Sequence, residues 1–215
     1  MSPPAASVAS RRGAARRRSS GRSRRRWSLL VFVGVVLIAV GVALTAPLFR
    51  KAINEFILPL QYQDVIRQQA AEKHLDPALV AAVIHAETKF DPRTSPTGAE
   101  GLMQIEPQTA EFLARKSGAT TFTIDDLATP EVNIAYGSYY LRYLIDHYHG
   151  STELALAAYN AGVANVDRWV GRAGVAGNHL SVGDIPFAGT RAYVLRVLRA
   201  QRDYRRTYPT QLGYR

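Results

Sequence analysis

The sequence predicts an all-α fold: one helical domain that follows a single N-terminal transmembrane helix. Asp76-Pro77 and Thr129-Pro130 each place a capping residue directly before a proline, which is a typical start of an α-helix. Apolar residues recur at helical spacing after both starts, and no stretch of useful length alternates as a strand does. The 215 residues suffice for one domain of ordinary size plus an appendage. The predicted membrane helix is the run 27–49, which contains no charged residue.

The N-terminal part of the chain carries a strong charge asymmetry. Residues 1–26 hold nine arginines and no acid, have almost nothing to bury and are predicted to be disordered. Residues 27–49 match the roughly 20 apolar residues that cross a bilayer as a helix. Only Arg50 and Lys51 follow them, so the positive-inside rule predicts a cytoplasmic N-terminus, with the rest of the chain extracytoplasmic. A signal peptide cleaved near residues 41–43 is the alternative, although the apolar run exceeds the usual length of about 7–15 residues.

The remainder of the chain is predicted to be a connector, 50–61, a helical domain, 62–208, and a short C-terminal tail, 209–215. Its helices are expected from capping residues, prolines and apolar periodicity. They cover about 60–74, 77–87, 107–117, 129–148, 151–159, 163–170 and 191–204.

The formal net charge of +10 is distributed by segment. Residues 52–190 hold nine basic and sixteen acidic residues, so the body of the domain is mildly acidic, whereas residues 191–215 hold seven arginines against Asp203. The arginines between Arg191 and Arg206 have two interpretations. They form either a solvated helix face or a surface attracted to anions such as lipid headgroups or wall polymers.

Composition argues against metal, cofactor and nucleic-acid chemistry. There is no cysteine, which excludes disulfides and thiolate metal sites. Of the five histidines only His147 and His149 are close in sequence, and on a helix that spacing points the two rings apart. No glycine-rich loop suited to phosphate is present. We expect no cofactor, no metal and no nucleic-acid partner, because membrane topology already explains the N-terminal arginines.

Glu87 is the strongest candidate for a catalytic group. It ends the almost uncharged run 77–86, so its carboxyl should be poorly solvated and its pKa raised. A raised pKa suits a general acid near neutral pH. The alternative is a solvent-facing acid that happens to end a helix, a position that the helix dipole makes mildly unfavourable.

Two further segments have the composition of a sugar-binding surface. Gly98 and Gly101 indicate a tight turn, followed by two apolar residues and the amide of Gln104. In the segment 158–162, small residues surround a tyrosine and an asparagine. Each segment alone is weak evidence, and the second is equally explained by helix packing with a glycine cap.

Four blocks, taken in order, resemble the lytic transglycosylases of the soluble lytic transglycosylase type, lysozyme-like proteins related to goose-type lysozyme. The resemblance covers about residues 62–206 and implies a lysozyme-like helical catalytic domain. The blocks are Glu87-Thr88, Gly101-Leu102-Met103-Gln104, Ala158-Tyr159-Asn160-Ala161-Gly162 and Pro186-Phe187-Ala188-Gly189-Thr190-Arg191-Ala192-Tyr193-Val194.

The resemblance also assigns roles to single residues. It implies that Glu87 is the catalytic acid and that Met103, Gln104, Tyr159 and Asn160 line the cleft for the glycan strand. Tyr193 is similar to a family tyrosine whose hydroxyl lies near the acid, and an ordinary core aromatic residue is the alternative.

Three features depart from the family pattern. Thr88 replaces the usual serine but keeps the hydroxyl, and the loop 90–95 is one residue shorter than in common members. Gly189 stands where the family usually has a glutamate, which puts any substrate contact of that acid in doubt.

The implied reaction needs only one carboxylate. Glu87 would protonate the oxygen that links N-acetylmuramic acid to N-acetylglucosamine, and then act as base on the muramic 6-hydroxyl, which gives a 1,6-anhydro product. A hydrolytic glycosidase ordinarily needs two carboxylates. Asp91, Glu100 and Glu106 are the candidates for a second, and we interpret them as a capping residue, a solvent-facing turn residue and a helix N-terminal charge.

Two alternatives remain open. The first is a hydrolytic muramidase acting on the same bond, with a base from Glu106 or Glu100. The second is a non-enzymatic peptidoglycan-binding scaffold. The expected partners are glycan strands and the cytoplasmic membrane through 27–49, and wall-synthesis or division proteins are further candidates.

Overall fold

The computed structural model describes residues 27, 32–46, 57–172 and 180–214. The chain divides into two units, 1–51 and 52–215. Within the second unit the described residues form helices, and their β-structure is limited to one isolated antiparallel bridge between Glu100 and Ile105. The predicted all-α fold is therefore confirmed for the part of the chain that is described.

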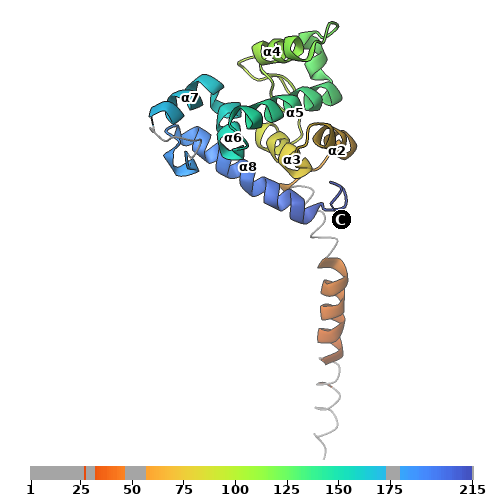
Figure 1. Ribbon diagram of the computed structural model, residues 1–215. Helices are drawn as coiled ribbons and strands as arrows, with labels where there is room; N and C mark the ends of the chain where they lie inside the picture. The colour runs from red at the N-terminus through yellow and green to blue at the C-terminus, as the bar shows by residue number, and fades with distance from the viewer. Residues whose placement is uncertain (1–26, 28–31, 47–56, 173–179, 215) are drawn as a thin grey trace, which may run out of the picture. The chain divides into compact units, whose positions relative to one another are not determined.

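Seven α-helices and two 3₁₀ helices of the second unit are described, and Figure 1 shows their arrangement. Five of the predicted helices agree with the structure to within two residues at either end, and the first, predicted at 60–74, is shorter by three residues at its start. The elements are α2 (Gln63–Glu72), α3 (Pro77–Glu87), α4 (Pro107–Ser117), η1 (Ile124–Ala128), α5 (Pro130–His147), α6 (Thr152–Ala161), α7 (Val163–Arg172), η2 (Val182–Asp184) and α8 (Ala188–Thr207).

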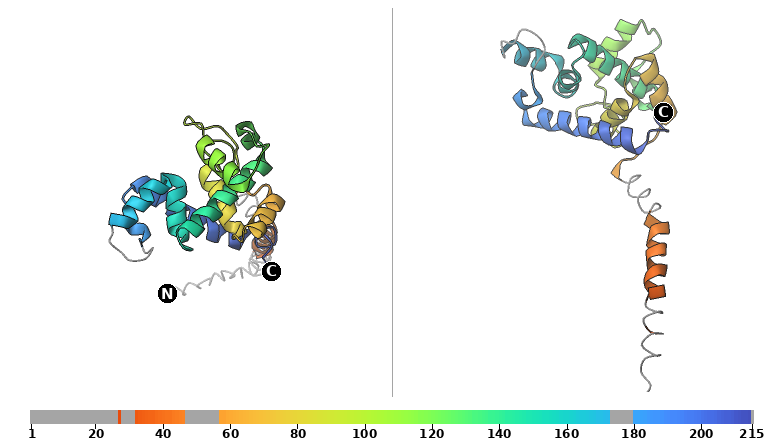
Figure 2. Two further views of the ribbon diagram at one scale, coloured as in Figure 1. Left: turned by 45° about the horizontal axis from the view of Figure 1, so that its top comes forward. Right: turned by 60° about the horizontal axis from the view of Figure 1, so that its bottom comes forward.

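Helix α3 is the centre of the domain. It begins where the Asp76 side chain accepts a hydrogen bond from the Ala78 N–H, as the Asp-Pro signature predicted. All residues from Ala78 to Ile84 are buried, so the helix is apolar on every side and has protein around it. Helix α8 packs along α3 and also contacts α6, while α2 packs on α3 and α5. Figures 1 and 2 show α8 along one edge of this unit and α4 at the opposite edge.

The structure differs from the sequence prediction at α8 and at the two 3₁₀ helices. Helix α8 begins at Ala188 rather than at Arg191, because its cap residue, Phe187, supplies no side-chain hydrogen bond and gives no start signal. The 3₁₀ helices η1 and η2 were not predicted. Each begins with a reciprocal capping box, Thr123 with Asp126 and Ser181 with Asp184, and that spacing is recognisable in sequence.

The predicted domain limits also differ from the described structure. Leu58, expected in the connector, and Leu212, expected in the tail, are both members of the buried core. The Tyr214 hydroxyl donates a hydrogen bond to Asp76 at the start of α3. The helical domain therefore includes these flanking residues, beyond the predicted limits of 62 and 208.

The predicted transmembrane segment is described only in part. Residues 32–46 are helical and their apolar side chains are largely exposed, with Leu37 65% and Ile38 69% accessible. Residues 28–31 and 47–49 of this segment, the tail 1–26 and the connector up to 56 lie outside the described residues. Where the chain is described, no helix combines the length and the apolar character needed to span a bilayer.

Candidate active site

The site is built around the C-terminal end of α3. Glu87 is the last residue of this helix, and its side chain is half-buried. The Tyr193 hydroxyl, from the buried face of α8, donates a hydrogen bond to Glu87 Oε1 at 2.7 Å. Because α3 and α8 pack along each other, the acid and the tyrosine come together although 106 positions separate them in the chain.

The pKa of Glu87 is raised, as the sequence predicted. Burial of the carboxyl is the largest cause, since it disfavours the ionised form. The hydrogen bond from Tyr193 and the positive charges of Arg196 and Arg93 oppose this effect. Burial and the negative charge of Glu87 raise the pKa of Tyr193 well above its usual value, so Tyr193 stays a hydrogen-bond donor.

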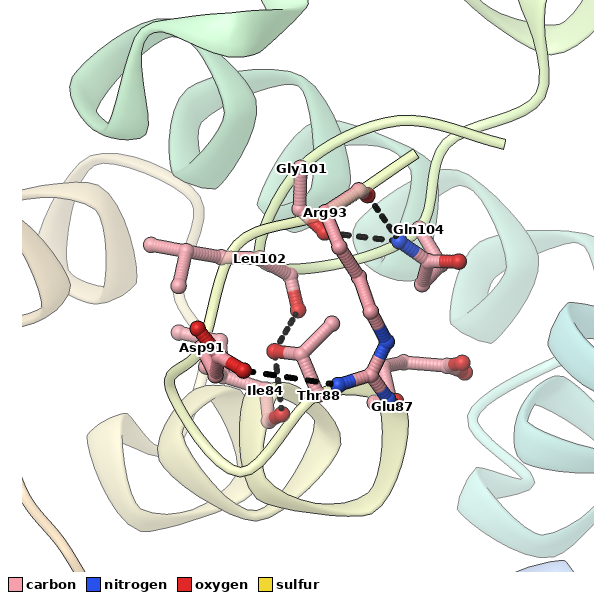
Figure 3. Close-up of polar contacts among 8 residues, drawn as sticks. All are labelled: Ile84, Glu87, Thr88, Asp91, Arg93, Gly101, Leu102 and Gln104. Atoms are coloured by element: carbon pink, nitrogen blue, oxygen red, sulfur yellow. Dashed lines mark hydrogen bonds and ion pairs between the residues drawn. The ribbon is translucent and has the colours of Figure 1, made fainter. Parts of the chain in front are cut away.

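A hydroxyl and a guanidinium connect the end of α3 to the turn that follows it (Figure 3). Thr88 Oγ1 donates to the Leu102 carbonyl at 2.7 Å and lies 3.2 Å from the Ile84 carbonyl. The Arg93 guanidinium donates to the backbone carbonyl of Glu87 at 3.1 Å. Thr88 thus uses its hydroxyl, which the usual serine would also provide, to hold the end of α3 against the turn.

The turn 98–105 is held by the buried side chain of Asn133 on α5. Asn133 Oδ1 accepts from the Met103 N–H at 2.8 Å, and its Nδ2 donates to the Glu100 and Leu127 carbonyls. Gly101 has a φ of 75°, and a Cβ there would lie 2.3 Å from Asn133 Nδ2. Gly101 is therefore required both by the backbone conformation and by the close approach of Asn133.

Gln104 closes the same turn. Its backbone has a positive φ of 49°, and its Nε2 donates to the carbonyls of Arg93, at 2.7 Å, and Gly101, at 2.9 Å (Figure 3). The amide group is thus fixed at the surface of the site, next to the loop that carries Arg93.

A cavity of about 400 Å³ opens beside Glu87. Three other predicted site residues, Gln104, Tyr159 and Asn160, line it, so the structure brings these residues together with the acid. The full lining is Glu87, Ser95, Thr97, Ala99, Gln104, Ile105, Glu106, Thr109, Tyr140, Tyr159, Asn160, Ala161 and Gly162. A second hollow, lined by Phe112, Tyr143, Val163 and Gln108, shares Glu106, Thr109 and Tyr140 with this cavity.

Met103 does not lie where the prediction put it. Its side chain is fully buried and packs against α5 at Gly137, where a Cβ would come within 2.3 Å of the sulfur. The backbone of Met103 reaches the site instead, because its carbonyl accepts a hydrogen bond from the Tyr159 hydroxyl at 2.9 Å. Met103 therefore supports the lining residue Tyr159 and does not line the cavity with its own side chain.

The remaining predicted residues connect α6 to α8. Asn160 Oδ1 accepts from Thr190 Oγ1 at 2.9 Å, which joins the third and fourth sequence blocks. Tyr193 is 2% exposed, so it acts on the site through its bond to Glu87 and not as an open wall of the cavity. A side chain at Gly189 would meet nothing within 4 Å, so the missing glutamate leaves open space there.

The three candidates for a second carboxylate have different environments. Asp91 is exposed, and its carboxylate lies 3.9 Å from the Arg93 guanidinium. Glu100 accepts a hydrogen bond from Thr94 Oγ1 at 2.9 Å. Only Glu106 among them lines the same cavity as Glu87, where it precedes α4 without making a side-chain cap.

Sequence reasoning missed two residues that shape the site. Asn133 and Tyr140 both lie on α5, and Tyr140 lines the cavity with its ring centre 5.3 Å from that of Tyr159. Burial raises the pKa of Tyr140 to about 12. A polar Asn133 among apolar neighbours, four residues after Thr129, was the signal available in the sequence.

Comparisons with known proteins agree with this geometry. Residues 64–181 match the family described as Transglycosylase SLT domain. The chain is similar to the soluble lytic murein transglycosylase of Escherichia coli K12, with 35% identity over 150 residues, which cover 68% of this chain and 23% of that protein. It is also 30% identical over 168 residues to the membrane-bound lytic murein transglycosylase C of Edwardsiella ictaluri, covering 68% of this chain and 47% of that one.

Solved structures give the same result. An inactive glutamate-to-glutamine mutant of lytic transglycosylase Slt from Pseudomonas aeruginosa superposes with a TM-score of 0.66 at 30% identity, over 73% of this chain and 26% of that one. The 70 kDa soluble lytic transglycosylase, solved as a complex with bulgecin A, gives a TM-score of 0.64 at 32% identity, over 74% and 27%. The chain thus spans only about a quarter of the soluble relatives that it matches.

Proposed function

Since the chain belongs to the Transglycosylase SLT domain family, we propose that it is a membrane-anchored peptidoglycan lytic transglycosylase. It cleaves the bond between N-acetylmuramic acid and N-acetylglucosamine without consuming water, and it leaves 1,6-anhydro-muramic ends. The observation that carries this proposal is the Glu87 carboxyl, which combines a raised pKa with a place on the cavity wall and a bond to Tyr193.

In the first step Glu87 is the general acid. Its protonated carboxyl donates to the glycosidic oxygen, the bond from this oxygen to the muramic C1 breaks, and N-acetylglucosamine leaves with a free 4-hydroxyl. Positive charge develops at C1, and the substrate's own acetamido group relieves it. Burial supports this step, because it keeps a larger share of Glu87 protonated near neutral pH.

In the second step Glu87, now ionised, is the base. It accepts the proton of the muramic 6-hydroxyl, whose oxygen bonds to C1 and closes the anhydro ring. The hydrogen bond from Tyr193 and the nearby positive charges of Arg196 and Arg93 support the carboxylate at this stage. The second step regenerates the protonated acid, so one carboxyl serves the whole cycle.

The cavity lining supports a glycan substrate. Tyr140 and Tyr159 offer aromatic surface for sugar rings, and Gln104 and Asn160 offer amide groups for hydroxyls and acetamides. We assign murein as this glycan because relatives that are similar to the chain are named murein transglycosylases.

Anchoring is proposed from the sequence of residues 27–49, which carry no charge between an arginine-rich tail and Arg50. A relative named as membrane-bound shares 30% identity with this chain. The anchor holds the catalytic domain on the outer face of the cytoplasmic membrane, where its substrate lies.

The test uses the full chain in detergent with purified sacculi and identifies the products by mass spectrometry. We expect products ending in anhydromuramic acid, and a fall in rate of about 10²–10⁴-fold for Glu87→Gln. Glu131→Gln, an exposed acid on α5, is the matched control and should keep full activity. Sacculus binding without products from the unmodified chain would favour the scaffold.

The muramidase alternative rests on Glu106, which lines the same cavity as Glu87. A hydrolytic enzyme would release reducing ends heavier by one water, and it would then depend on Glu106 as well as on Glu87. In a lytic transglycosylase Glu106→Gln should leave the anhydro product as the main product.

A further inference from the structure

Helix α8 has two faces of opposite character. Tyr193, Val197 and Tyr204 belong to its buried face, which packs on the domain. Leu195, Arg199, Arg202 and Arg206 follow one another at intervals of four, three and four residues, so they lie in one line along the helix. All four are exposed. We call this line the outer face of α8.

The outer face carries uncompensated positive charge. Of its three arginines, Arg206 is paired with Asp203 at 3.0 Å. Arg199 and Arg202 have no hydrogen-bond or ion-pair partner among the described residues. Because residues 52–190 are acidic overall, this concentration of arginines is unusual for the domain.

An apolar side chain lies in the same line as these cations. Leu195 is 52% exposed, although leucine side chains gain free energy by leaving water. Arginines interspersed with exposed leucine are typical of helices that lie on an anionic bilayer, where the cations meet headgroup phosphates and the apolar side chain enters the interface.

The chain enters the domain next to α8. The Tyr204 hydroxyl donates to the Pro59 carbonyl at 2.5 Å, and the Tyr208 hydroxyl donates to the Leu58 carbonyl at 2.8 Å. Nine residue steps separate Leu58 from Phe49, the end of the apolar run, and they can reach at most about 30 Å. A bilayer that holds residues 27–49 is therefore within reach of the C-terminal half of α8.

We infer that the outer face of α8 binds the anionic phosphate headgroups of the membrane that anchors the chain. The inference rests on the proposed anchoring, and it adds an orientation to it. Tyr193 contacts Glu87 from the opposite side of the same helix, so a membrane on the outer face leaves the Glu87 cavity on the side away from the lipid. Lipid contact thus directs the cavity toward the cell wall.

The absence of cysteine allows a site-specific test in the full chain. Leu195→Cys on the outer face and Ser117→Cys on α4 are each labelled with an environment-sensitive fluorophore and reconstituted into vesicles. The vesicles contain phosphatidylcholine alone, or phosphatidylcholine with about one third phosphatidylglycerol. We expect a blue shift at position 195 only with phosphatidylglycerol, its loss at high salt, and no shift at position 117 in either vesicle.

The requirement for positive charge is tested with two separate variants, each of which lacks two cations at one edge of the domain. In the Leu195→Cys background, the double variant Arg199→Gln with Arg202→Gln should bind lipid less often. The ratio of protein with its outer face on the lipid to protein with that face free should fall about 25-fold, since each arginine contributes about fivefold to this ratio. The matched control, Arg115→Gln with Lys116→Gln, removes the same charge from α4 and should leave the blue shift unchanged. An equal loss in both variants would overturn the inference, because net charge alone would then explain the response.

The remaining outcomes separate the inference from the proposed anchor. A chain that floats with phosphatidylcholine vesicles but gives no shift with phosphatidylglycerol keeps the anchor and overturns the lipid-binding face. A chain recovered with vesicles only when phosphatidylglycerol is present loses the anchor and supports the face. A shift produced in phosphatidylcholine vesicles by an added soluble polyphosphate wall polymer, and not by phosphatidylglycerol, would assign the face to wall polymers and overturn the inference.

Discussion

Burial and a hydrogen bond act in opposite directions on the pKa of the Glu87 carboxyl. Burial disfavours the carboxylate and raises its pKa, whereas the hydroxyl of Tyr193 donates to the ionised form and lowers it. In the proposed mechanism, in which Glu87 is the acid in one step and the base in the next, burial favours the protonated form and the Tyr193 hydrogen bond favours the ionised form.

Tyr193→Phe removes the opposing hydrogen bond and leaves the burial. The pKa of Glu87 should rise further, so that Glu87 stays protonated to higher pH. The alkaline limb of the pH profile of kcat/KM should therefore move to higher pH. We expect a loss of about tenfold in kcat/KM at the optimum, the cost of about one positioned hydrogen bond. The pH dependence of product release from sacculi measures both effects.

Tyr204→Phe on the same helix is the control for this prediction. It removes a hydroxyl bonded to the Pro59 carbonyl and leaves Glu87 untouched. Its alkaline limb should coincide with that of the unmodified chain. If Tyr193→Phe also left the limb in place, the hydroxyl would have no influence on the acid.

Single residues of the site were predictable to different degrees. The uncharged run before Glu87 was sufficient to predict burial and a raised pKa, because both follow from local composition. The contact between Glu87 and Tyr193 was suggested by the family resemblance alone, since it depends on how α3 and α8 pack. The family resemblance implied that Met103 lines the cleft, and the structure differs because the turn 98–105 directs this side chain into the core against α5.

At the scale of elements, the turn 98–105 is fixed by α5. Asn133 satisfies one N–H and two carbonyls of buried backbone, so losing it would leave polar groups unpaired in the core. The sequence motif Gly101 to Gln104 therefore depends on a helix that begins about 30 residues later. The helices that begin at a proline, α3, α4 and α5, were predicted to within one residue, whereas this long-range support was not predicted because no local pattern encodes it.

Gly101→Ala and Gly98→Ala separate the two reasons for glycine in this turn. Both have positive φ, 75° and 85°, so both substitutions carry the conformational cost of about 1–2 kcal/mol. At Gly101 the new Cβ would also meet Asn133 Nδ2 at 2.3 Å and the Leu127 carbonyl at 2.6 Å, whereas at Gly98 it meets nothing within 4 Å. We expect Gly101→Ala to lower the free energy of unfolding by roughly 2 kcal/mol more than Gly98→Ala, measured by urea denaturation. Equal losses would mean that Asn133 can move aside.

At the scale of the whole molecule, the chain divides into two units, 1–51 and 52–215. Every residue of the buried core cluster lies between Leu58 and Leu212, and none comes from residues 32–46. The C-terminal segment is part of that core, because Leu212 is 1% exposed and Tyr214 joins Arg205 and Gln201 on Asp76 at the start of α3. Sequence alone assigned residues 209–215 to a tail, since a short segment without helical periodicity gives no sign of burial.

Two deletions test this division. A chain that lacks residues 1–51 should unfold within about 2 °C of the full chain in detergent, because it loses no core residue.

A chain that also lacks residues 209–215 should have a Tm lower by about 5–10 °C. Burying Leu212 contributes about 1.5–3 kcal/mol, and each kcal/mol corresponds to about 2–4 °C in a domain of this size. The deletion also removes Tyr214, one of the three partners of the Asp76 carboxylate. Since Asp76 begins the helix that Glu87 ends, the second deletion should also reduce activity, and a Tm unchanged by it would return residues 209–215 to the status of a tail.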